Sequence, residues 1–151
     1  MRINLVSCQM VKEKSVNYQT SEFDTRSISS PASVYMIATE VLHLDTASEE
    51  YFYIIMLNTK NRINGIAEIS HGDLSSSIAH PREVFKLAML ANAASIICIH
   101  NHPSGEPEPS NNDKEITNRL VEAGDILGIK VHDHIIIGED RYFSLKQQGL
   151  M

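Results

Sequence analysis

The segment over residues 95–113 constrains the fold most, because it joins an apolar strand to a rigid polar loop and a helix start. Residues 95–99 are short and apolar, which is typical of a buried strand. Residues 101–109 are polar and rich in proline and glycine, so they predict a loop. Ser110 then begins a helix, whose apolar positions recur at helical spacing: Ile116, Leu120, Ala123 and Leu127.

The rest of the chain predicts further strands and helices. Aromatic and β-branched residues over 51–57, a turn and a second strand predict a hairpin over 51–69. Ser30 and Pro31 suit the N-cap and first turn of a helix reaching about Val41. The other expected elements are edge strands within 3–18, a loop over 19–30, a buried helix over 81–94, a strand over 130–138 and a last strand over 142–145. This order predicts an α/β fold of the α+β kind, a mixed β-sheet flanked by helices.

Composition narrows the class of protein. The chain has 151 residues, enough for one domain, and a formal net charge of −6 with no dense Lys/Arg cluster. Tight nucleic-acid binding by this chain alone is therefore not expected. No apolar run is long enough for a membrane helix, and the first residues do not resemble a secretion signal. Cys8 and Cys98 form no CxxC pair, and Cys98 reads as a buried thiol, so we expect a reducing, cytoplasmic setting.

Two histidines at the end of the 95–99 strand point to a metal site. Side chains at positions i and i+2 of an extended chain point to the same side, so the imidazoles of His100 and His102 can converge on one ion. Asp113 can supply a third ligand if the proline-rich loop folds back. Three protein ligands with a fourth position left for water are typical of catalytic zinc. The spacing therefore predicts a Zn2+ site.

Structural explanations compete with this interpretation. Ser110 and Asp113 also match a capping box that opens a helix, and both readings can hold together, because a cap would fix Asp113 in place. A second HxH pair, His132 and His134, lacks an acidic residue at a suitable spacing, so a structural role is expected for it. Cys98 shares a strand face with His100, but packing is the simpler explanation.

The whole string HNHPSGEPEPSNND resembles the JAMM metal motif of the MPN (JAB) domain superfamily, and its closest resemblance is to the bacterial RadC family. The segments PREVFKLAMLANAASIICIHNHPSGEPEPSNND and VHDHIIIGEDRYFSL resemble that family too. The similarity covers roughly residues 30–151, which leaves residues 1–29 as an N-terminal extension. The resemblance implies the MPN/JAB architecture, which is cytidine-deaminase-like, and a zinc-dependent peptidase type of site.

The resemblance also implies roles for single residues. His100, His102 and Asp113 match the metal ligands, and Ser110 matches the motif serine that helps stabilise the oxyanion. Glu50, just before the strand over 51–57, best matches the general acid/base. If the match to the family is shifted by one residue, Glu49 takes this position instead. Glu83 matches a family motif as well, and we interpret it as structural.

These parts suit amide hydrolysis, because zinc acidifies water and a nearby carboxylate can move the proton. We therefore expect a zinc metalloprotease or isopeptidase acting on a peptide or protein, with no expectation for its oligomeric state. The alternatives are a non-catalytic DNA repair or recombination accessory with a structural zinc, and a metal-dependent nuclease. Related full-length proteins usually carry a helix-hairpin-helix region before this domain. With about 48 residues before the strand, we expect this chain to lack it, which disfavours a DNA role.

Overall fold

A computed structural model describes residues 28–72 and 79–151 of the chain. Its helices are α1 (Pro31–Glu40), α2 (Pro81–Leu90) and α3 (Asn111–Leu127). Its strands are β1 (Glu50–Leu57), β2 (Ile63–Gly72), β3 (Ser95–Asn101), β4 (Lys130–Ile137) and β5 (Tyr142–Ser144). The edge strands expected within 3–18 and nearly all of the predicted extension over 1–29 lie outside the described residues.

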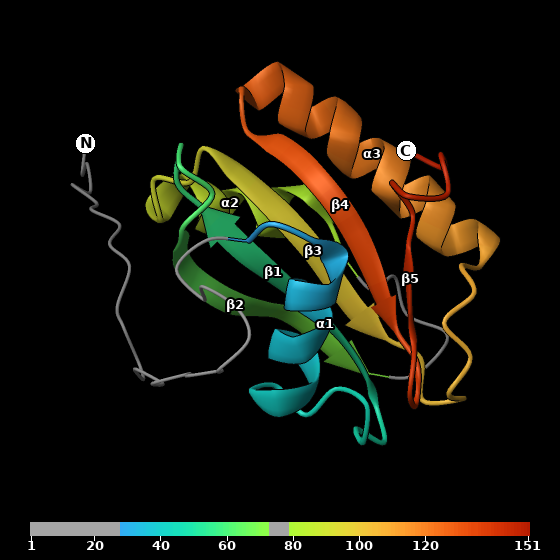
Figure 1. Ribbon diagram of the computed structural model, residues 1–151. Coiled ribbons are helices and arrows are strands. Elements are labelled where there is room, and N and C mark those ends of the chain that lie inside the picture. Colours follow the sequence, from blue (N-terminus) through green and yellow to red (C-terminus); the bar gives the residue numbers. More distant parts are fainter. Residues whose placement is uncertain (1–27, 73–78) are drawn as a thin grey trace, which may run out of the picture.

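The strands form one five-stranded mixed sheet in the order β2-β1-β3-β4-β5 (Figure 1). The predicted hairpin is confirmed as the antiparallel pair β1 and β2, and β1 also pairs antiparallel with β3. β3 and β4 are parallel, so the chain must cross over between them. That crossover consists of the polar loop and α3, and it places the end of β3 beside the start of α3.

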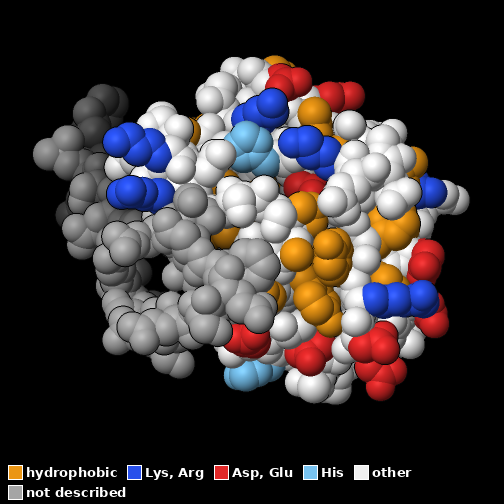
Figure 2. All heavy atoms as spheres, viewed as in Figure 1, with side chains coloured by type: hydrophobic (Ala, Val, Ile, Leu, Met, Phe, Trp, Pro, Cys, Tyr) orange, Lys and Arg blue, Asp and Glu red, His pale blue; other side chains and the backbone are white. Residues whose placement is uncertain are grey.

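Helices cover both faces of the sheet, as the sequence predicted. On one face, α2 and α3 pack over β-strand side chains that include Phe52, Ile54 and Cys98. On the other face, α1 packs over a second apolar layer that includes Ile97 and Ile135. Figure 2 shows this second face, with hydrophobic side chains gathered near its middle. Both layers meet along β3, in which every residue is buried.

The predicted helix over 81–94 is wrong in its end and in its burial. α2 stops at Leu90, because Asn92 takes a left-handed φ of 50° and the Ala93 amide turns back to Ala88 O at 2.9 Å. The helix is buried on one side only, and Met89 is 52% exposed on the other. β3 extends two residues further than predicted, through His100 to Asn101.

The structure also bears on the predictions made for Cys98 and for membrane-spanning helices. Cys98 is a fully buried free thiol, and burial raises its pKa. It therefore belongs to the core, as predicted. Within 28–72 and 79–151, every helix is too short or too polar to cross a bilayer.

Gly138, directly after β4, allows the proline-rich loop to lie on the end of the sheet. A Cβ atom at this position would lie 2.4 Å from the backbone oxygen of Gly105 and 2.9 Å from Cδ of Pro107. The same loop is held by hydrogen bonds from the His102 amide to Ile137 O at 2.9 Å and from the Glu139 amide to Gly105 O at 3.1 Å. A side chain at 138 would therefore push the loop, and His102 with it, off the sheet.

We expect Gly138→Ala to destabilise the domain by about 1–3 kcal/mol, because the new methyl group meets backbone that has little room to shift. Gly65→Ala is the matched control, since a Cβ there meets only the flexible Cε of Met56 at 3.3 Å. Urea unfolding of the two variants and the wild type measures the difference. Equal midpoints for Gly138→Ala and the wild type would contradict this account of the loop.

Candidate metal centre

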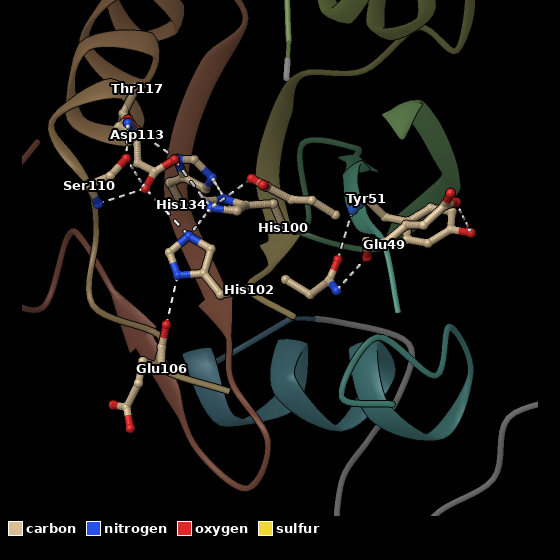
Figure 3. A network of polar contacts seen from close by, with 11 residues as sticks. Glu49, Tyr51, His100, His102, Glu106, Ser110, Asp113, Thr117 and His134 are labelled. Carbon is tan, nitrogen blue, oxygen red and sulfur yellow. Dashed lines mark hydrogen bonds and ion pairs between the residues drawn. The ribbon is translucent and has the colours of Figure 1, made fainter. Parts of the chain in front are cut away.

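Four side chains converge at the carboxyl end of β3. Figure 3 shows three of them, His100, His102 and Asp113. Glu50 is the first residue of β1, His100 lies near the end of β3, His102 follows that strand and Asp113 lies in the first turn of α3. One ligand atom from each side chain lies within 4.8 Å of all the others. The structure thus brings together the three predicted metal ligands and the predicted acid/base.

The distances among three of these groups match what one tetrahedral ion requires. Nε2 of His100 lies 3.0 Å from Nε2 of His102 and 3.3 Å from Oδ1 of Asp113. Nε2 of His102 lies 3.5 Å from Oδ2 of Asp113. Ligands about 2.0–2.1 Å from a tetrahedral ion are separated by roughly 3.3 Å. Glu50 is set further back, with Oε1 4.0 Å from His100 Nε2.

The four side chains of the site are largely buried. The side chain of His100 is 0% exposed, Asp113 2% and Glu50 6%. His102 is the most accessible member, with its side chain 16% exposed.

Asp113 is fixed by the capping box that begins α3. Its Oδ2 accepts hydrogen bonds from the Ser110 amide at 2.7 Å and the Ser110 hydroxyl at 2.6 Å. Its own amide donates to Ser110 Oγ at 3.1 Å. The predicted capping box is therefore confirmed, and it leaves Oδ1 of Asp113 3.3 Å from Nε2 of His100.

Each imidazole is oriented by a partner on its other nitrogen. His102 donates through Nδ1 to the backbone oxygen of Glu106 at 2.7 Å, and its Nε2 faces His100 and Asp113. Nδ1 of His100 lies 2.8 Å from Nε2 of His134, and Nδ1 of His134 lies 2.6 Å from the Thr117 hydroxyl. Such outer partners hold metal-binding histidines in one orientation.

Asn101 holds the backbone on both sides of Glu50. Its Oδ1 accepts from the Tyr51 amide at 2.8 Å, and its Nδ2 donates to the Glu49 carbonyl at 2.9 Å. Glu50 belongs to the four-residue group. The exposed Glu49 carboxylate lies instead 3.5 Å from the Tyr51 hydroxyl (Figure 3). The strand start is therefore fixed with Glu50, rather than Glu49, beside the histidines.

Comparison with known proteins agrees with this architecture. Residues 28–150 match the family described as RadC-like JAB domain. The chain belongs to this family. It is 54% identical over 123 residues to a UPF0758 protein of Caldanaerobacter subterraneus subsp. tengcongensis, a match that covers 82% of this chain and 52% of that protein.

Further UPF0758 relatives give the same picture. A protein of Desulfitobacterium hafniense is 48% identical over 125 residues, a match that covers 82% of this chain and 54% of that protein. One of Rubrobacter xylanophilus is 51% identical over 125 residues, with coverages of 82% and 53%. The RadC-like JAB chain thus spans about half the length of these curated relatives. Their names state no activity.

The pKa values of the two carboxyl groups in this RadC-like JAB site are shifted in opposite directions. Burial raises the pKa of Glu50, against the lowering effect of His100 and His102. Burial would also raise the pKa of Asp113, but the two histidines beside it and the hydrogen bonds from Ser110 hold it well below its ordinary value of 3.8. Asp113 therefore stays ionised at neutral pH, whereas Glu50 binds a proton more readily than an ordinary glutamate.

Some residues around the RadC-like JAB site were missed by the sequence analysis. His134 was expected to be structural, and its contact with His100 depends on the β3–β4 register, which pairs Cys98 with His134. Thr117 lies four residues after Asp113, so helical spacing alone could have placed it on the same face.

Asp133, which lies between His132 and His134, has a structural role. It accepts hydrogen bonds from the Ser144 hydroxyl at 2.6 Å and from the Lys146 amide at 3.1 Å, and so holds the C-terminal residues.

The depressed pKa of Asp113 predicts a specific loss of stability in acid for the metal-free domain. The unfolded chain takes up a proton near 3.8, whereas the folded state does not, so the unfolding free energy falls as pH drops below that value. One such group contributes a slope of up to about 1.4 kcal/mol per pH unit.

Asp113→Asn removes this group, so the unfolding free energy of the variant should fall less steeply as the pH drops below 3.8. Urea unfolding between roughly pH 2.5 and 5, with chelator present, measures both slopes. Parallel profiles for the wild type and the variant would contradict the assignment.

Proposed function

We propose that this domain is a zinc-dependent hydrolase that cleaves a peptide or isopeptide bond. One observation carries the proposal: three donor groups lie at the mutual spacing of tetrahedral ligands, and a buried carboxylate stands just behind them. Catalytic zinc sites have three protein ligands and one open position, and this arrangement supports that type of site. The function of the longer relatives is a separate question, because this chain matches only half of them.

Two imidazoles and one carboxylate form a donor set that favours zinc. Magnesium and calcium instead prefer sites made of oxygen ligands. His100 and His102 would bind through Nε2, and Asp113 through its carboxylate. When bound there, zinc lowers the pKa of water toward ~7 and polarises a carbonyl group. The permanent negative charge of Asp113 suits a cation at this position.

Glu50 is proposed as the group that moves the proton. Its carboxylate takes a proton from the attacking water and passes it to the leaving amine, which needs a residue that can both bind and release a proton near neutral pH. Burial raises the pKa of Glu50 and supports this role. The Asn101 side chain fixes the backbone on both sides of Glu50, so the carboxylate is held in position.

Ser110 is proposed to donate to the oxyanion of the tetrahedral intermediate. In the present structure the Ser110 hydroxyl donates to Asp113 Oδ2, with 2.6 Å between the two oxygen atoms. Donation to a substrate oxygen therefore requires this hydroxyl to turn away from Asp113. The Ser110 amide still donates to the same carboxylate, so that Asp113 keeps one of its bonds.

We expect the purified domain to hold one zinc ion per chain, and His100→Ala or Asp113→Asn to lose it, because each variant removes one of three ligands. His132→Ala is the matched control, since His132 belongs to the other HxH pair and lies outside the four-residue group. Elemental analysis by mass spectrometry after dialysis measures the metal. Stoichiometric zinc in both ligand variants would exclude this site.

Glu50→Gln is expected to retain zinc and to lose hydrolysis by a factor of about 10² or more, because the amide cannot carry the proton. Glu49→Gln, one residue away and exposed, should behave like the wild type. Cleavage of fluorogenic peptide and isopeptide libraries by the zinc-loaded proteins measures the effect. A fully active Glu50→Gln protein would contradict the proposed role, and an inactive zinc-loaded wild type would favour a structural role for the metal.

A further inference from the structure

His134 and Thr117 are two buried polar side chains behind His100 for which the proposed mechanism has no use. His134 is 0% exposed and Thr117 1%. They come from different elements, β4 and α3, and they meet behind the metal centre (Figure 3). Their hydrogen bonds have directions that follow from simple proton counting.

The count begins at Thr117. Its hydroxyl lies 2.5 Å from the carbonyl oxygen of Asp113, and a carbonyl oxygen can only accept, so the single hydroxyl proton is used there. Thr117 Oγ1 must then accept from Nδ1 of His134 at 2.6 Å. The His134 ring is fully buried, which favours its neutral form with one N–H. That proton is on Nδ1, and Nε2 of His134 is an acceptor.

The acceptor on His134 determines the state of His100. Nδ1 of His100 lies 2.8 Å from that Nε2, so His100 donates through Nδ1 and carries a lone pair on Nε2. Nε2 is the atom that faces His102 and Asp113. His100 is therefore placed in the one tautomer that can bind a metal from this position.

The chain of bonds also ties two of the proposed ligands together. It begins at the backbone of Asp113, passes through Thr117 and His134 and ends on His100. Phe52 packs against both rings, with centroids 6.0 Å from His100 and 5.3 Å from His134. Neither ring can turn without displacing Phe52, which is fully buried.

We propose that Thr117 and His134 are positioning residues that fix His100 as its Nδ1–H tautomer and so present Nε2 to the metal before any metal binds. This inference rests on the proposed metal site, because it assigns His100 as a ligand through Nε2. The tautomer itself is a property of the metal-free protein. The two ideas can therefore be tested separately.

The first experiment reads the tautomer directly, by ring-nitrogen NMR of the 15N-histidine-labelled, metal-free chain. In the wild type and in Thr117→Ser, which keeps the hydroxyl, His100 should carry its proton on Nδ1. Thr117→Val keeps the shape but removes the acceptor for His134 Nδ1–H. His134 should then move its proton to Nε2 and donate to His100, whose own proton moves to Nε2.

The second experiment measures zinc affinity by competition with a chelator. Loss of an outer partner of a metal-binding histidine typically weakens binding 10–100-fold, and we expect that loss for Thr117→Val, with little change for Thr117→Ser. His134→Gln retains an acceptor for His100 and should bind more tightly than His134→Leu, which has none. Circular dichroism melts confirm that each variant is folded, and Thr117→Val carries the test if His134→Leu is not.

The outcomes separate the two ideas. Nε2 protonation of His100 in the metal-free wild type would overturn the inference, and so would equal zinc affinity of folded Thr117→Val and the wild type. A wild type without measurable zinc affinity, but with the expected tautomers, would instead overturn the proposed metal function and leave the hydrogen-bond chain in place. Weaker binding in Thr117→Val together with the tautomer shift supports both.

Discussion

The arrangement of the site depends on the pairing of β3 with two neighbours of opposite direction. β3 is buried along its whole length, antiparallel to β1 and parallel to β4. The antiparallel register sets Phe52 opposite His100, and the parallel register brings His134 beside Cys98, two residues before His100. Because side chains alternate between faces, a shift of either strand by one residue would turn its contribution to the opposite face.

The same few bonds serve the local fold and the site. The Ser110–Asp113 cap satisfies backbone groups that every helix start leaves unpaired, and it also holds a carboxylate toward two imidazoles. Thr117 bonds to the carbonyl of the preceding turn and, through the same oxygen, reaches His134. The bonds that orient these side chains are thus the same bonds that begin α3 and attach it to β4.

Much of this could be predicted from the sequence, because the decisive signals are local. The His100, His102 and Asp113 group follows from strand alternation and a helix cap within one segment, and the hairpin and helices follow from periodicity. The long-range partners could not be predicted in this way. The contact of His134 with His100 depends on strand register, and the role of Asn101 depends on β1 lying beside it. The end of α2 was missed because Asn92 terminates it through a left-handed conformation that apolar spacing does not reveal.

The side chain of Asn101 has a consequence for how the sheet ends. Its amide group offers one acceptor and one donor to β1, as a peptide group of a further strand residue would. It therefore acts as an extra rung of the ladder at the point where the main chain of β3 departs toward His102. β3 can leave the sheet there without letting the first residues of β1 fray, so the chain turns away toward His102 while β1 stays paired.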